Sequence, residues 1–144
     1  MIERLENIGI VVEDLEAAIA FFVGLGMELE GQAPVEGPEV DRINGLEGVR
    51  ADIAMVRAPD GGAAVELMKF HHPVAVSAES NAPVNALGIR RILFGVKDIK
   101  TMAADLQARG MELMGEVVPF ADSYLFCYVR GPEGIIVALC EKLD

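Results

Sequence analysis

Two charged side chains interrupt apolar stretches of this sequence. Glu66 lies within AAVELMKF, and Arg91 opens RILFGV. A guanidinium can hold a carboxylate or carbonyl oxygen through two N–H donors, and a carboxylate can act as a general base. Glu66 and Arg91 are therefore candidates for chemistry on a small organic molecule. The alternative is that they neutralise each other as a buried ion pair, because burying either charge alone is costly.

Further residues of the predicted site follow from the alternation of strands, in which successive side chains point to opposite faces. In the run YLFCYV, three aromatic side chains share one face. Met68 shares a face with Glu66 in the same way. The predicted ligand-binding residues are Asn7, Met55, Met68, Tyr124, Phe126 and Tyr128. Such a mostly apolar wall with a few polar groups is typical of a small-molecule pocket, here for a carboxylate- or carbonyl-bearing compound.

The elements that must position these residues occur twice. GMELEG at 26–31 returns as GMELMG at 110–115. The same offset aligns Asp14 with Asp98, each placed to cap a helix, and the apolar stripes of the two helices that follow. It also aligns the short apolar strands at 7–12 and 91–96. One offset thus aligns the strands, the helix caps, the helices and the glycines that end them. This agreement indicates a duplicated unit.

The second half of each unit repeats as well. RAPDG at 57–61 corresponds to RGPEG at 130–134, and each reads as a turn between two strands. The predicted fold is therefore α+β, with two tandem βαβββ modules. Module one is 1–70, the linker 71–88 and module two 89–144. The first module carries an additional segment at 32–48, either a functional lid or a tolerated insertion.

Composition limits the partners. The formal charge is −11, and 52% of the residues are apolar. An acidic chain is repelled by nucleic acid and by anionic membranes, and no apolar run approaches the ~18 residues of a membrane span. We therefore predict a cytoplasmic protein that binds neither nucleic acid nor membranes. Cys127 and Cys140 lie in apolar strands and are expected as buried thiols. His71 or His72 could serve a shifted site, but both stand at a strand end.

The chain resembles the vicinal oxygen chelate superfamily of glyoxalases, bleomycin-resistance proteins and extradiol dioxygenases. The resemblance rests on NIGIVVEDLEAAIAFFVGLGMELEG, the PDG turn before AAVELMKF, RILFGVKDI and YVRGPEGIIVAL. It implies cupped mixed sheets around a ligand cavity, with the helices on the outside. This cavity usually holds a divalent metal, with ligands on the first and last strands of each module. The corresponding residues are Asn7, Glu66, Arg91 and Ala138. This correspondence makes Glu66 and Arg91 the predicted catalytic residues. Only Glu66 is an ordinary ligand, so we predict no metal and no other cofactor.

Three further functions stay open. The resemblance implies, as alternatives, a metal-dependent glyoxalase-type lyase or isomerase, or a dioxygenase, with atypical ligands. A drug-sequestering protein of the bleomycin-resistance type would suit the acidic composition, because such a protein attracts cationic compounds. A partner domain with no small ligand is the last alternative. Homodimers are common in the superfamily, so a homodimer is expected.

Overall fold

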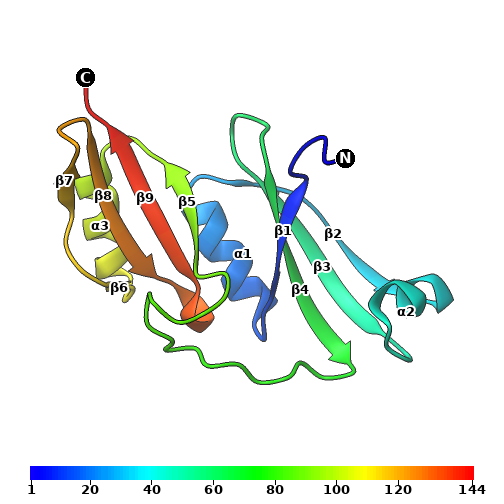
Figure 1. Cartoon of the computed structure of the whole chain (residues 1–144). Helices are drawn as coiled ribbons and strands as arrows, with labels where there is room; N and C mark the ends of the chain where they lie inside the picture. The colour runs from blue at the N-terminus through cyan, green and yellow to red at the C-terminus, as the bar shows by residue number, and fades with distance from the viewer. The chain divides into compact units, whose positions relative to one another are not determined.

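The computed structural model describes residues 1–144, which form two compact units (Figure 1). Unit 1 is Met1–Ser77 and unit 2 is Ala78–Asp144. Each unit contains a mixed sheet and repeats the predicted order of strand, helix and further strands. The predicted α+β fold with tandem modules is confirmed. No helix is both long and apolar enough to cross a membrane.

Unit 1 has a four-stranded sheet in the order β1-β4-β3-β2, in which β1 runs parallel to β4 and the other pairs are antiparallel. Its elements are β1 (Asn7–Val11), α1 (Leu15–Gly24), β2 (Glu28–Glu36), α2 (Pro38–Asn44), β3 (Arg50–Arg57) and β4 (Ala64–His72). The additional segment at 32–48 supplies the end of β2 and the short helix α2, which contacts β2.

Helix α1 begins and ends where the sequence predicts. The carboxylate of Asp14 accepts a hydrogen bond from the backbone N–H of Ala17 at 3.0 Å and caps the helix. Beyond the helix, Gly26 adopts the left-handed conformation with φ 112°. The helix contacts β3 and β4, and Phe22 is completely buried, as are Val56 and Leu67 on these strands. We call the opposite face of this sheet the open face of unit 1.

Unit 2 repeats the architecture, with the strand order β5-β9-β8-β6 and with β7 also paired to β8. Its elements are β5 (Arg91–Gly95), α3 (Ile99–Ala108), β6 (Glu112–Leu113), β7 (Val118–Phe120), β8 (Tyr124–Arg130), the 3-10 helix Pro132–Gly134 and β9 (Ile136–Lys142). The second strand of this unit is thus split into β6 and β7. Helix α3 lies behind β8 and β9 in Figure 1 and contacts both. The other face is the open face of unit 2.

The cap of α3 differs from the prediction. Asp98 lies in the left-handed region with φ 59°, and its side chain makes no capping hydrogen bond. Glu141, on the helix side of β9, instead accepts a hydrogen bond from the backbone N–H of Ile99 at 2.9 Å. This bond, a second from the backbone of Asp98 and the charge of Lys100 lower the pKa of Glu141 below its usual value. A residue 42 positions away therefore caps this helix.

Replacing Glu141 with glutamine should lower the melting temperature by roughly 2–4 °C at pH 7, because a charged acceptor at the start of α3 becomes neutral. The folded-state pKa is depressed, so the stabilisation is complete above the unfolded value near 4.5 and is lost as the pH falls through the folded-state value. The melting temperatures of the wild type and Glu141→Gln should therefore converge at acidic pH, as the pH falls through the folded-state pKa of Glu141. Glu79→Gln, which changes an exposed carboxylate in the same unit, should alter the melting temperature little at either pH.

The segment before β5 is fixed to unit 2 by Arg130, whose side chain is only 11% exposed. Its guanidinium donates hydrogen bonds to the carbonyl oxygens of Ser80 at 3.0 Å, Ala82 at 2.6 Å and Gly134 at 3.2 Å. Gly134 has φ 84°, and a Cβ there would overlap the backbone of Ser80. Part of the segment predicted as a linker, 71–88, is thus anchored against the β8–β9 turn.

Candidate functional site

The open face of unit 1 carries Glu66 at its centre. In the register of the sheet, Glu66 lies between Gly9 on β1 and Met55 on β3, and Met55 is paired in turn with Gly31 on β2. A Cβ at Gly9 or at Gly31 would meet nothing within 4 Å, so the neighbouring strands leave free space on this face. Its side chain is half-buried and forms no hydrogen bond or ion pair. The carboxylate is therefore available to a ligand.

Two more predicted residues share this face. Met68 is half-buried beside Val11 and Ile53, one row further along the strands from Glu66. Asn7 is exposed and lies on the same face of β1 as Gly9. The burial of β1 alternates between exposed and half-buried, as the predicted parity requires. The surroundings of Glu66 are consequently apolar, with one amide nearby along β1.

Arg91 lies on the open face of unit 2, where it contacts a predicted aromatic residue. Its guanidinium carbon is 4.9 Å from the ring centroid of Tyr128, within the range of a cation–π interaction. Leu93 and Tyr128 are both paired with Ala138, so only a methyl group lies between Leu93 and Tyr128 in this row. The Arg91 side chain is exposed and forms no hydrogen bond or ion pair. Its N–H donors are free for an oxygen ligand while the ring of Tyr128 supports it.

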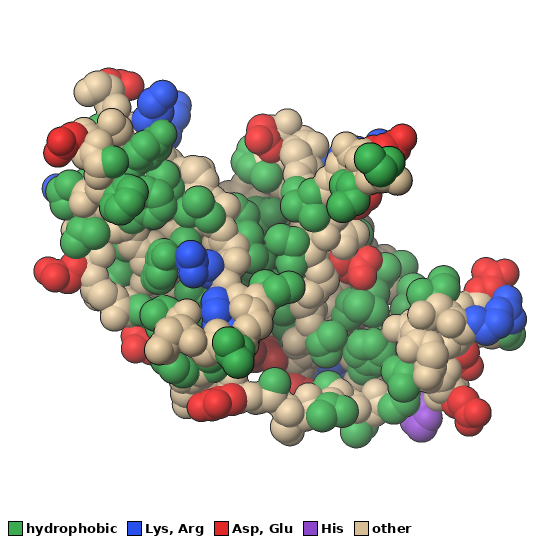
Figure 2. All heavy atoms as spheres, in the orientation of Figure 1, with side chains coloured by type: hydrophobic (Ala, Val, Ile, Leu, Met, Phe, Trp, Pro, Cys, Tyr) green, Lys and Arg blue, Asp and Glu red, His purple; other side chains and the backbone are tan.

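The same face contains a pocket of about 490 Å³ within unit 2. Phe126 and Tyr128, two of the predicted ligand-binding residues, belong to its walls. Phe120 packs edge-on against Phe126, with ring centroids 5.7 Å apart. The ring centroid of Tyr124 lies 6.1 Å from that of Phe126. Figure 2 shows hydrophobic side chains gathered over β8 and β9 with basic atoms beside them. The face therefore combines an aromatic pocket with a cation.

Sequence reasoning missed part of this pocket. The lining residues that were not predicted are Val84, Met114, Gly115, Glu116, Val118 and Phe120. Most belong to the loop and the short strand β7 between β6 and β8. The sequence of this segment predicted only a connecting loop, because a strand of three residues gives a weak signal. The alternation of Val118 and Phe120 around Pro119 was the available signal for a strand facing the pocket.

Neither histidine joins these faces. His71 follows Leu67 and Lys69 on the helix side of β4, and its Nε2 atom lies 2.8 Å from a carboxylate oxygen of Asp52. The exposed His71–Asp52 pair borders a separate hollow of about 660 Å³ beside the start of α1. His72 lies at the last position of β4, where its ring would contact a Cβ at Gly48. Glu66 therefore has no histidine beside it in unit 1.

Two copies of a βαβββ unit, each with one helix-covered sheet face and one apolar open face, define the class of this protein. Residues 6–128 match the family model of the Glyoxalase/Bleomycin resistance protein/Dioxygenase superfamily. A solved glyoxalase family protein from Bacillus cereus is 45% identical, with a TM-score of 0.96 over 100% of this chain and 97% of that chain. The chain belongs to the Glyoxalase/Bleomycin resistance protein/Dioxygenase superfamily.

More distant solved structures share the fold. Trypanothione-dependent glyoxalase I of Leishmania major is 18% identical, with a TM-score of 0.67 over 96% of this chain and 86% of that chain. An antibiotic-binding protein from Streptomyces sp. CB03234 is also 18% identical, with a TM-score of 0.63 over 99% of this chain and 98% of that chain. No curated protein matches the chain. These likenesses establish the architecture, and the chemistry must come from the residues of this chain.

The side chains at the family's usual metal positions do not fit a metal. Arg91 stays protonated and repels a cation, and Ala138 has no donor atom. Asn7 offers one carbonyl oxygen, which leaves Glu66 as the one ordinary ligand, whereas a catalytic zinc normally has three from the protein. The structure also contains no group of three or more His, Cys, Asp or Glu side chains placed to hold a metal ion. The donor set thus departs from that of a metal-dependent superfamily member.

Proposed function

We propose that this protein binds a small, carbonyl- or carboxylate-bearing organic molecule and acts on it through Arg91 and Glu66, without a metal at the family positions. The observation that carries the proposal is the aromatic pocket of unit 2, whose wall residue Tyr128 also supports Arg91. Its volume of about 490 Å³ suits a compound of two or three rings. The apolar walls supply affinity, and the guanidinium supplies orientation.

The chemistry proposed for these residues is proton transfer next to a carbonyl group, as in isomerases and lyases. Two N–H groups of Arg91 hold the carbonyl oxygen. A general base removes a proton from the carbon next to the carbonyl group, and the electron pair moves into that group to form an enolate. The Glu66 carboxylate is the base that the sequence predicts for this step. The guanidinium stabilises the negative charge on that oxygen. Return of the proton to carbon restores the carboxylate.

The ketone 2-acetonaphthone tests this proposal, because it combines a two-ring body with a carbonyl group and exchangeable methyl protons. Proton NMR in D₂O should show that the protein accelerates exchange of the methyl protons for deuterium. Glu66→Gln and Arg91→Met should each slow the catalysed exchange by about 100-fold, because one removes the base and the other the oxyanion contact. The rate should be unchanged in EDTA, since no metal takes part.

Matched controls separate these effects from changes in net charge. Glu47→Gln alters an exposed carboxylate of unit 1, and Arg109→Met removes the cation at the C-cap of α3, which pairs with Asp105. Both should keep the wild-type exchange rate. Binding of the ketone without accelerated exchange would reject the catalytic part and leave a binding protein. A rate that collapses in EDTA and returns with a divalent cation would restore the metal-dependent alternative. The homodimer and the cytoplasmic location stay predictions.

A further inference from the structure

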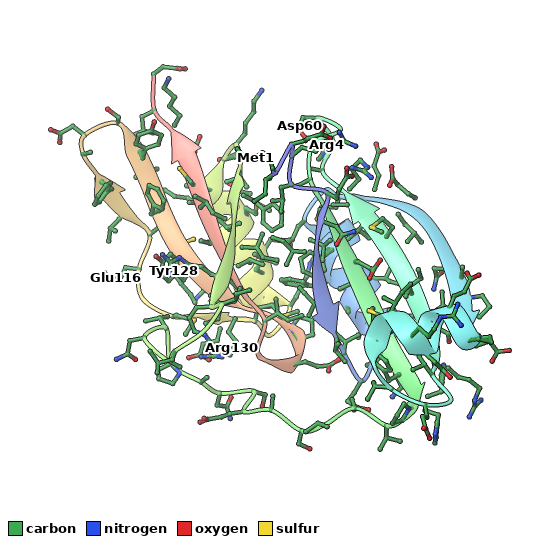
Figure 3. The ribbon with its side chains drawn as sticks, turned by 45° about the vertical axis from the view of Figure 1, so that its right-hand side comes forward. Met1, Arg4, Asp60, Glu116, Tyr128 and Arg130 are labelled. Carbon is green, nitrogen blue, oxygen red and sulfur yellow. The ribbon has the colours of Figure 1, made fainter.

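The pocket of unit 2 has one charged residue in its wall. Glu116 lies on the loop before β7, while the other side chains that line the pocket are aliphatic, aromatic or a thiol, apart from the phenol of Tyr128. Glu116 is exposed and forms no hydrogen bond or ion pair with the protein. Figure 3 labels Glu116 and Tyr128, which belong to the same pocket wall. A single unpaired carboxylate therefore borders an otherwise apolar space.

A ligand in this pocket must deal with that carboxylate. An apolar group placed against Glu116 would remove water from the charge and return no hydrogen bond, which is costly. A carboxylate of the ligand would be repelled at the same place. An amino or hydroxyl group would donate a charge-assisted hydrogen bond. The pocket accordingly distinguishes ligands by the group that they present to Glu116.

The rings of the pocket limit the shape of the ligand. Phe120 and Phe126 meet edge-on at an interplanar angle of 74°. The guanidinium of Arg91 contacts the ring of Tyr128. Flat ring systems gain the most from such walls, because aromatic groups prefer offset-stacked and edge-to-face contacts. Gly115 adds no side chain to the wall, and a Cβ there would meet nothing within 4 Å. The space beside Glu116 is open to the edge of a flat molecule.

We propose that the ligand of this pocket is a planar aromatic carbonyl compound of at least two fused rings that carries an amino or hydroxyl group remote from its carbonyl. Glu116 accepts the hydrogen bond of that donor, while Arg91, in contact with Tyr128, takes the carbonyl oxygen. This inference rests on the proposed function and adds Glu116 as the residue that determines specificity. Glu116 acts in recognition and takes no part in proton transfer.

Three ketones that differ at one position test the inference on the unmodified protein. The probes are 2-acetonaphthone, its 6-amino derivative and its 6-carboxy derivative, with dissociation constants measured by calorimetry. The amino ketone should bind about tenfold more tightly than the parent, and the carboxy ketone about tenfold more weakly. In Glu116→Ala the three constants should fall within about twofold of one another, whereas Glu79→Ala should preserve the wild-type order.

The outcomes separate this inference from the function on which it rests. Equal affinities of the parent and the amino ketone for the wild type would overturn the role of Glu116 and leave the proposed function intact. An unchanged preference in Glu116→Ala would do the same. Failure of all three ketones to bind would overturn both. Loss of fold cannot confuse the result, because the comparison among ligands in the wild type needs no variant.

Discussion

Replacing Phe22 with alanine is expected to lower the free energy of unfolding by about 3–5 kcal/mol, which is the usual cost of removing a buried aromatic side chain. Phe22 is 0% exposed and packs edge-on against Phe21, with ring centroids 5.1 Å apart. It joins α1 to the sheet that carries Glu66, and the cavity left by the ring cannot close without moving the helix. Urea denaturation followed by circular dichroism measures the change.

A neighbouring residue on the same helix provides the control for this prediction. Val23 is 44% exposed, so Val23→Ala should cost less than about 1 kcal/mol. Hydrogen exchange with mass spectrometry should show the loss of protection in Phe22→Ala first in peptides from α1, β3 and β4. Equal costs for the two substitutions would mean that α1 is not packed on its sheet as described.

The duplicated architecture could be predicted because it depends on local signals. Asp14 caps the start of α1, and Gly26 adopts the left-handed conformation just after its end, both as the sequence indicates. Gly110, the equivalent of Gly26, also has a positive φ of 91°. Successive side chains of a strand alternate between the two faces of the sheet, so Glu66 and its neighbour Leu67 lie on opposite faces. The complete burial of Leu67 shows that its face is the one covered by the helix.

Contacts that depend on pairing between distant strands could not be predicted in this way. The contact of Arg91 with Tyr128 is an example, because Arg91 is in register with Ile136 and not with the row of Tyr128. A long side chain reaches this diagonal neighbour across the small Ala138. The cap of α3 by Glu141 is another example, since the residue that supplies it lies on the last strand. Local propensity contains no information on either contact.

Gly134→Ala should destabilise the protein by about 2–4 kcal/mol, because it adds a steric conflict to a strained backbone position. The new methyl group would overlap the backbone of Ser80 and displace the segment that Arg130 holds through Ser80 and Ala82. Val84 follows two residues after Ala82 and lines the aromatic pocket. Displacement of the segment should therefore also weaken the binding of 2-acetonaphthone, by about fivefold.

The internal repeat provides the matched control, because RAPDG and RGPEG place Gly61 at the position equivalent to Gly134. Gly61 also has a positive φ, 77°, but a Cβ there would meet nothing within 4 Å. Gly61→Ala should thus lower the free energy of unfolding by only about 1 kcal/mol, the cost of placing alanine in a left-handed conformation, and leave binding unchanged. Thermal and urea denaturation of both variants, with ketone binding, isolates the contact with Ser80. Equal losses for the two glycines would show that this contact neither stabilises unit 2 nor positions Val84.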